Sequence, residues 1–209
     1  MSLFIALEGP DGSGKTTQIT LLCEALQVEG HRVVCTREPG GTNIGEQIRQ
    51  VLHDVENRAM LPVTEILLYS AARAQHVGEL IRPALEQGQI VVTDRYAAST
   101  LAYQGYGRGL DLGMLRTITE FATGGLYPDL IIYLDLDVTV GLQRKLGDRR
   151  QGRGEWNRMD QQTVAFHRRI RQGYLEMARE ATDRWLTIDA TQPVETIHRI
   201  ILGRVKSLL

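Results

Sequence analysis

Five short apolar runs, separated by longer segments with helical periodicity, organise the chain. Runs this apolar are typical of parallel strands that are covered on both faces of a sheet. They occupy residues 3–7, 32–36, 89–93, 130–134 and 185–188. Apolar residues recur at helical spacing over 16–28, 43–54, 61–87, 111–122, 137–146, 160–181 and 193–208, with N-caps expected at Asn43, Asp111 and Asp137. The alternation predicts an α/β fold, a doubly wound, five-stranded parallel sheet flanked by helices.

The segment between the first strand and the first helix has the pattern of a phosphate-binding P-loop. Residues 9–16 read Gly-Pro-Asp-Gly-Ser-Gly-Lys-Thr and fit G-x-x-x-x-G-K-[ST] in the order strand, loop, helix. The glycines let successive backbone N–H groups converge on phosphate oxygens, and the start of the helix adds partial positive charge. Lys15 is expected to reach the β and γ phosphates, and Thr16 to hold Mg²⁺. We expect a P-loop NTPase type of fold whose nucleotide contacts are Gly9, Pro10, Asp11, Gly12, Ser13, Gly14, Lys15, Thr16 and Thr17.

Charged residues follow the other predicted strands, at the edge of the sheet where ligands bind in folds of this class. Asp94 and Arg95 come directly after the third apolar run. We expect Asp94 to hold Mg²⁺ through water and Arg95 to bridge the donor and acceptor phosphates. A surface ion pair is the plainer explanation, but a strand end beside a P-loop favours contact with ligand.

A basic segment with interspersed glycines lies between two predicted helices. Residues 144–171 hold nine arginines and lysines against three acidic residues. Gly147, Gly152 and Gly154 interrupt the middle of this segment and make it flexible. We interpret residues 147–159 as an arginine-rich lid that closes over polyphosphate, and the helical arginines after it as a solvated face.

Composition narrows the class of protein further. A chain of 209 residues fits one domain, taken here as residues 1–209. The net charge of −1 argues against nucleic acid as a partner, and no apolar run reaches membrane length. The first strand begins too early to leave room for a signal peptide. Cys23 and Cys35 lie in apolar stretches without a C-x-x-C pattern, so we expect buried thiols in a reducing, cytoplasmic location.

Several of these motifs together resemble the thymidylate kinase family, the branch of the nucleoside monophosphate kinases that acts on dTMP. The resemblance runs nearly end to end. It rests on the P-loop, residues 36–42 (Thr-Arg-Glu-Pro-Gly-Gly-Thr), 69–73 (Tyr-Ser-Ala-Ala-Arg), 94–96 (Asp-Arg-Tyr), 99–100 (Ser-Thr), 102–105 (Ala-Tyr-Gln-Gly) and 127–129 (Tyr-Pro-Asp). It implies ATP- and Mg²⁺-dependent phosphoryl transfer to dTMP, giving dTDP, by a homodimer.

The resemblance also implies a role for each matching residue. The thymine contacts are Arg73, Gln104, Ser99 and Thr100, with Tyr69 stacking on the base. Tyr103 lies against the deoxyribose, and Asp11 reaches its 3′-hydroxyl. The acceptor phosphate is held by Arg37, Arg49 and Arg95, with Glu38 and Pro39 in the same dTMP-binding segment. Gln192 lies in the loop that packs on adenine, and the metal contacts are Thr16 and Asp94.

The source of the catalytic arginine distinguishes two forms of the family. None of the residues 10–13 in the P-loop is basic, so the chain resembles the form in which the lid supplies this charge. We expect Lys15, Arg95, Arg153 and Arg158 to be catalytic, ahead of Arg149 and Arg150. The glycines at 152 and 154 favour this order, whereas Asn157 departs from the aspartate expected before Arg158.

The main alternative is another small kinase, either a different monophosphate kinase or a deoxynucleoside kinase that would use Glu8 or Glu38 as a base. A phosphate monoester is already largely ionised at neutral pH, so transfer to a monophosphate needs no general base. A GTPase-type switch is disfavoured because the guanine-reading Asn-Lys-x-Asp run is absent.

Overall fold

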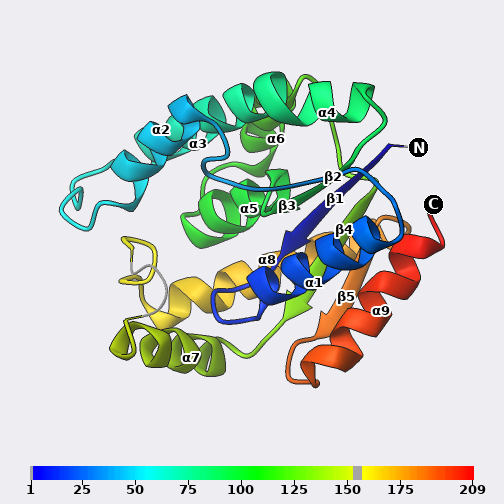
Figure 1. Cartoon of the computed structure of the whole chain (residues 1–209). Helices are drawn as coiled ribbons and strands as arrows, with labels where there is room; N and C mark the ends of the chain where they lie inside the picture. Colours follow the sequence, from blue (N-terminus) through cyan, green and yellow to red (C-terminus); the bar gives the residue numbers. More distant parts are fainter. Residues whose placement is uncertain (1, 153–156) are drawn as a thin grey trace.

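Five parallel strands form one sheet in the order β2-β3-β1-β4-β5. The computed structural model describes residues 2–152 and 157–209 (Figure 1). The strands are β1 (Leu3–Glu8), β2 (Val33–Arg37), β3 (Ile90–Asp94), β4 (Leu130–Asp135) and β5 (Trp185–Asp189). Each strand ends one residue beyond its apolar run. The charged residues Glu8, Arg37, Asp94 and Asp135 are therefore the last residues of their strands, and Arg37 lies beside Asp94 in the register.

Helices cover both faces of the sheet (Figure 1). They are α1 (Lys15–Val28), α2 (Asn43–His53), α3 (Pro62–His76), α4 (Arg82–Glu86), α5 (Ala97–Thr100), α6 (Leu112–Thr123), α7 (Val138–Arg150), α8 (Val164–Glu180) and α9 (Val194–Lys206), with π-helical turns η1 (Val77–Ile81) and η2 (Leu101–Gly107). Alternate residues of β1 point to opposite faces, as the pleat requires. Ile5 packs with α1 and α9 in one core, and Phe4 packs with η1 and α4 in another.

Two of the three expected N-caps are confirmed. Asp111 accepts a hydrogen bond from the Met114 N–H at 2.7 Å, and Asp137 accepts one from the Thr139 N–H at 2.9 Å. The cap of α2 is Thr42 rather than Asn43, because the Thr42 hydroxyl accepts from the Gly45 N–H at 3.1 Å.

Two segments differ from the sequence prediction. Residues 97–107 are helical, although no apolar periodicity in the sequence predicts a helix there. This segment packs closely against α8, since a Cβ at Gly107 would lie 2.7 Å from the Phe166 ring. Tertiary packing therefore accounts for the helical conformation of residues 97–107. Helix α7 continues to Arg150, so Gly147 is helical and does not begin a flexible lid. A helix accepts one glycine when its neighbours favour the helix, at a cost of about 1 kcal/mol.

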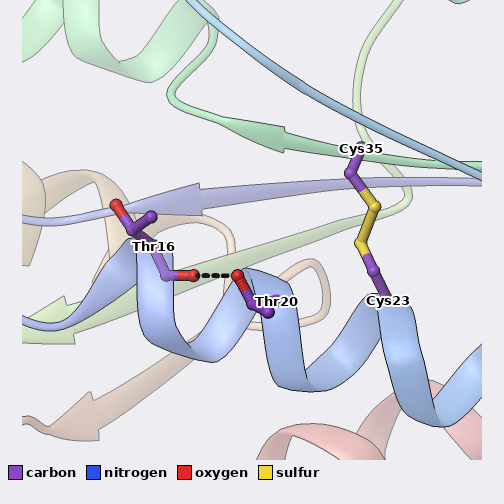
Figure 2. The surroundings of a disulfide bond; sticks show 4 residues. All are labelled: Thr16, Thr20, Cys23 and Cys35. Carbon is purple, nitrogen blue, oxygen red and sulfur yellow. Dashed lines mark hydrogen bonds between the residues drawn. A yellow bond between two sulfur atoms is a disulfide. The ribbon is translucent and has the colours of Figure 1, made fainter.

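The prediction of two buried thiols is wrong. Cys23 on α1 and Cys35 on β2 form a disulfide, with their Cα atoms 6.7 Å apart (Figure 2). The pairing follows from the tertiary structure, because α1 packs beside the edge strand β2. One turn before Cys23, the Thr20 hydroxyl donates to the main-chain oxygen of Thr16. With both cysteines paired, they no longer support a reducing location.

None of the helices within the described residues has both the length and the apolar composition needed to cross a bilayer.

Candidate active site

The carboxyl ends of β1, β2 and β3 open into one cavity of about 720 Å³. Its walls come from the P-loop, the segment after β2, α2, α3, the α5–η2 helix and α7. Most residues that the sequence singled out line it: Asp11, Gly12, Gly14, Lys15, Thr16, Thr17, Arg37, Glu38, Pro39, Arg49, Tyr69, Arg73, Asp94, Arg95, Ser99, Thr100, Tyr103 and Gln104. The fold therefore brings together segments that are distant in the chain, from Asp11 to Met159.

The P-loop occupies one end of the cavity. Gly12 and Gly14 have φ angles of 78° and 90°, which only glycine adopts without strain. The Lys15 ammonium is buried and donates to the carbonyl oxygens of Gly9 and Pro10, both at 3.1 Å. Burial lowers the pKa of Lys15, and the neighbouring charge of Arg95 acts in the same direction. This end of the cavity is built for polyphosphate.

Asp11 lies at the centre of a cluster of positive charge. Its carboxylate is 2.8 Å from Arg95 Nη2 and 2.6 Å from Lys145 Nζ. Burial alone would raise the pKa of Asp11, but Arg95, Lys15 and Lys145 outweigh it and hold the pKa well below its usual range. Lys145 also lies 2.5 Å from Asp160. Burial and the charge of Asp11 raise the pKa of Asp160 to about 6.

Asp94 and Thr16 fit a magnesium ion held mainly by phosphate and water. The Asp94 Oδ1 atom is buried and has no hydrogen-bond partner within the described residues, as expected of an oxygen directed at a cation or its water. Thr16 is exposed at the start of α1. Over residues 2–152 and 157–209, no group of three His, Cys, Asp or Glu side chains is arranged as a metal cage. Mg²⁺ in phosphoryl-transfer sites requires only one or two protein ligands.

Arg73 also lines the cavity, and all three of its guanidinium nitrogens are engaged. Nε donates to Glu38 at 2.7 Å, Nη1 to the Thr100 hydroxyl at 2.7 Å, and Nη2 to the Tyr96 carbonyl at 3.1 Å. Glu38 is also 3.2 Å from the ring of His76. With 2% of its surface exposed, Arg73 is a buried, oriented group and not a helix-surface arginine.

A buried carboxylate that the sequence analysis missed organises the wall beside Arg73. Glu65 accepts from Gln104 at 2.8 Å, from Arg108 at 3.1 Å and from Arg158 at 2.5 Å. The signal was present in the sequence, since Glu65 precedes Tyr69 and Arg73 by four and eight residues and so lies on their face of α3. Burial and the charge of Glu65 raise the pKa of Tyr69 to about 12.

The structure does not bring every predicted residue to the cavity. The Arg158 guanidinium is buried against Glu65 and the Leu52 carbonyl, and does not line the cavity. Gln192 lies in the turn between β5 and α9, also outside the cavity lining, as do Gly9, Pro10 and Ser13. Arg153 falls outside the described residues.

Helix α7 supplies basic residues to the cavity, of which Arg149 was expected to rank behind Arg153 and Arg158, and Arg144 and Lys145 were not predicted as site residues. Arg144, Lys145 and Arg149 line the cavity. Arg144 donates to the Gly12 carbonyl of the P-loop at 3.2 Å. Helix α7 ends about one turn later than predicted, which places Arg149 within it, whereas Arg144 and Lys145 lie within the predicted helix.

Three comparisons with known proteins agree. The model of the thymidylate kinase family matches residues 7–201. The thymidylate kinase of Roseiflexus castenholzii is 51% identical over 100% of this chain and 95% of that protein, and that of Deinococcus radiodurans is 50% identical over 97% and 96%. The crystal structure of thymidylate kinase from Ehrlichia chaffeensis has a TM-score of 0.78, 31% identity and 98% coverage of both chains. The P-loop fold and the family expected from the sequence are confirmed: the chain belongs to the thymidylate kinase family.

Proposed function

We propose that this chain transfers the γ-phosphoryl group of ATP to dTMP, giving ADP and dTDP. The observation that carries the proposal is that the P-loop and the buried, oriented Arg73 line the same cavity. Arg95 lines it too and is bonded to Asp11 of the P-loop. The names of the relatives support this activity over the alternative of a different monophosphate or deoxynucleoside kinase.

At the donor end, the backbone N–H groups of the P-loop and Lys15 bind the phosphates of ATP. Thr16 and Asp94 would hold Mg²⁺, which would supply positive charge to the phosphates of ATP when bound. The unpartnered Asp94 oxygen supports this assignment. Gln192 is proposed to contact adenine only on the basis of resemblance.

At the acceptor end, Arg73, Thr100 and Gln104 present polar atoms to the thymine, and Ser99 lies beside them. Tyr69 stacks on the base, Tyr103 borders the deoxyribose and Asp11 reaches its 3′-hydroxyl. The acceptor phosphate is held by Arg37, Arg49 and Arg95, next to Glu38 and Pro39. Their common place in the cavity lining supports these assignments.

The reaction is promoted by positive charge and orientation, without a general base. The acceptor phosphate is already ionised, so the chain has to hold two polyanions together and stabilise the transferred group. Lys15 and Arg95 supply two of these charges, and Lys145, Arg144 and Arg149 of α7 supply the charge expected of the lid. Arg158 is better placed to anchor residues 157–160 to α3 than to contact phosphate.

A second copy of the chain is the proposed partner. Large apolar side chains are exposed on the neighbouring helices α3 and α6 and just before α3, namely Leu61, Val63, Leu67, Met114 and Phe121, the last 90% exposed. A homodimer would cover this apolar surface, whose exposure to water is unfavourable.

We also propose that residues 1–209 act as one kinase domain, in the cytoplasm where its nucleotide substrates are found.

A coupled assay of ADP release with a panel of acceptors tests the activity. We expect turnover with dTMP and much less with dCMP, dGMP, AMP or thymidine. Lys15→Ala serves as the control, because loss of one charge-stabilising contact costs on the order of 10²–10³ in rate. Faster turnover with thymidine or another monophosphate than with dTMP would overturn the proposal.

A further inference from the structure

Glu8 is a fully buried carboxylate, with 0% of its surface exposed, that the proposed mechanism does not use. It is the last residue of β1 and directly precedes the P-loop. It accepts three hydrogen bonds, from the Tyr96 N–H at 2.9 Å, from the Ser99 hydroxyl at 2.7 Å and from the Tyr174 hydroxyl at 2.8 Å. A buried carboxylate is costly, so an arrangement of three donors around it requires an explanation.

The first of these bonds acts on the backbone of Arg95. Arg95 has a φ of 69° and is the one non-glycine residue in the described part of the chain with a positive φ. A long side chain adopts this conformation only where its surroundings impose it. The N–H of Arg95 donates to the Leu7 carbonyl at 2.8 Å, and the next N–H, of Tyr96, donates to Glu8. The end of β1 therefore holds the peptide groups on both sides of the Arg95 Cα.

The other two bonds act on the side chain of Arg95. Its Nη1 atom faces the hydroxyl oxygens of Ser99 and Tyr174 at 3.4 and 3.5 Å. These two oxygens lie 2.9 Å from each other and both contact the same Glu8 oxygen. Tyr174 is held in turn by stacking on Tyr133, with ring centroids 4.9 Å apart.

The hydroxyl groups of Ser99 and Tyr174 have one proton each, and the direction of that proton depends on whether Glu8 accepts or donates. An ionised Glu8 only accepts, so both hydroxyl protons turn toward it and both oxygens present lone pairs to the Arg95 guanidinium. Burial raises the pKa of Glu8, while the charge of Arg95 and the three donors oppose that rise. Burial and the charge of Glu8 raise the pKa of Tyr174, which keeps the phenol protonated and therefore a donor.

We propose that Glu8 is a positioning residue that sets both the backbone turn and the side-chain direction of Arg95 through Tyr96, Ser99 and Tyr174. The inference rests on the role given to Arg95 in the proposed function. Glu8 is fully buried and does not line the cavity, so the proposal gives it no contact with the phosphates. It acts by fixing the arginine before substrate arrives, which removes an ordering cost from the reaction.

Glu8→Gln tests this with little change in shape. An amide has only one acceptor oxygen, so its NH2 group must face either the Tyr96 N–H or the two hydroxyl oxygens. In the first case the bond that holds the Arg95 turn is lost; in the second the hydroxyl protons turn away from residue 8, toward an Arg95 that offers only N–H groups. We expect kcat to fall roughly ten- to a hundredfold, as for a lost hydrogen bond to a charged group, with the KM for ATP within about twofold. Glu24→Gln, the same change at an exposed site on α1, should have no effect.

A double-mutant cycle separates positioning from a purely structural role. If Glu8 acts through Arg95, Glu8→Gln should change kcat by less than about twofold once Arg95→Ala is present. Losses that multiply, or a fall in melting temperature with unchanged kcat, would overturn the inference.

Tyr174→Phe, which deletes one hydroxyl, should give a smaller loss of the same kind and replaces Glu8→Gln if that variant does not fold. Full activity in Arg95→Ala would instead refute the role of Arg95, whereas an inactive Arg95→Ala beside a fully active Glu8→Gln refutes only the present inference.

Discussion

At the scale of single residues, the pairing of Arg73 with Glu38 makes recognition and stability inseparable. Arg73→Ala should lower kcat/KM for dTMP about ten- to a hundredfold and reduce the preference for dTMP over dCMP. It should also lower the free energy of unfolding by about 3 kcal/mol, because Glu38 is left buried and charged. Adding Glu38→Gln should restore part of the melting temperature without restoring dTMP use. A variant that keeps its preference for dTMP would rule out the role in reading the base.

At the scale of elements, α7 carries positive charge to the P-loop, and Lys145 is its central contribution. Lys145→Gln should lower kcat at least about tenfold and raise KM less, because the charge counts most in the transition state. Steady-state kinetics in both substrates measure this. Lys206→Gln is the matched control. It removes an exposed lysine at the end of α9 that pairs with Glu29, outside the cavity lining, and this variant should behave as the native chain. Equal kcat in the two variants would mean that the charge comes from elsewhere in the lid.

The disulfide between α1 and β2 is a second feature of this scale. Closing a loop of about a dozen residues stabilises a chain by about 3 kcal/mol in the loop-entropy model. Reduction should therefore lower the melting temperature by roughly 6–12 °C. A Cys23→Ser/Cys35→Ser variant should melt at the lower temperature and be insensitive to reductant. An unchanged melting temperature in the native chain under reductant would show that the bond does not form in solution.

At the scale of the whole molecule, the exposed apolar surface of α3 and α6 predicts a dimer of about twice 23.4 kDa. Phe121→Asp should shift the mass measured by light scattering toward that of one chain, because a carboxylate cannot be buried unpaired at an interface. Val28→Asp, at an apolar residue that is 88% exposed on α1, is the control and should leave the mass unchanged. A native chain that is monomeric at all concentrations would exclude this partner.

The sheet, the P-loop and most of the cavity lining could be predicted from the amino-acid sequence alone. Local patterns carry this information: apolar runs specify buried strands, and glycine spacing specifies the loop. In parallel sheets the carboxyl ends of the strands meet at one edge, so Arg37 and Asp94 were expected together and lie side by side.

The pairing of side chains across elements, by contrast, depends on how the helices and strands pack in the folded chain. Arg158 and Arg149 look alike in the sequence, but Glu65 on α3 holds Arg158 away from the cavity, while the extra turn at the end of α7 includes Arg149, which lines it. Cys23 and Cys35 read as separate thiols until α1 packs beside β2. The positioning role proposed for Glu8 follows from the hydroxyl groups of Ser99 and Tyr174, which donate to it in the folded chain. The physical reason is common to all three: the partner of a charged, buried or reactive group is set by packing between elements, which no local pattern encodes.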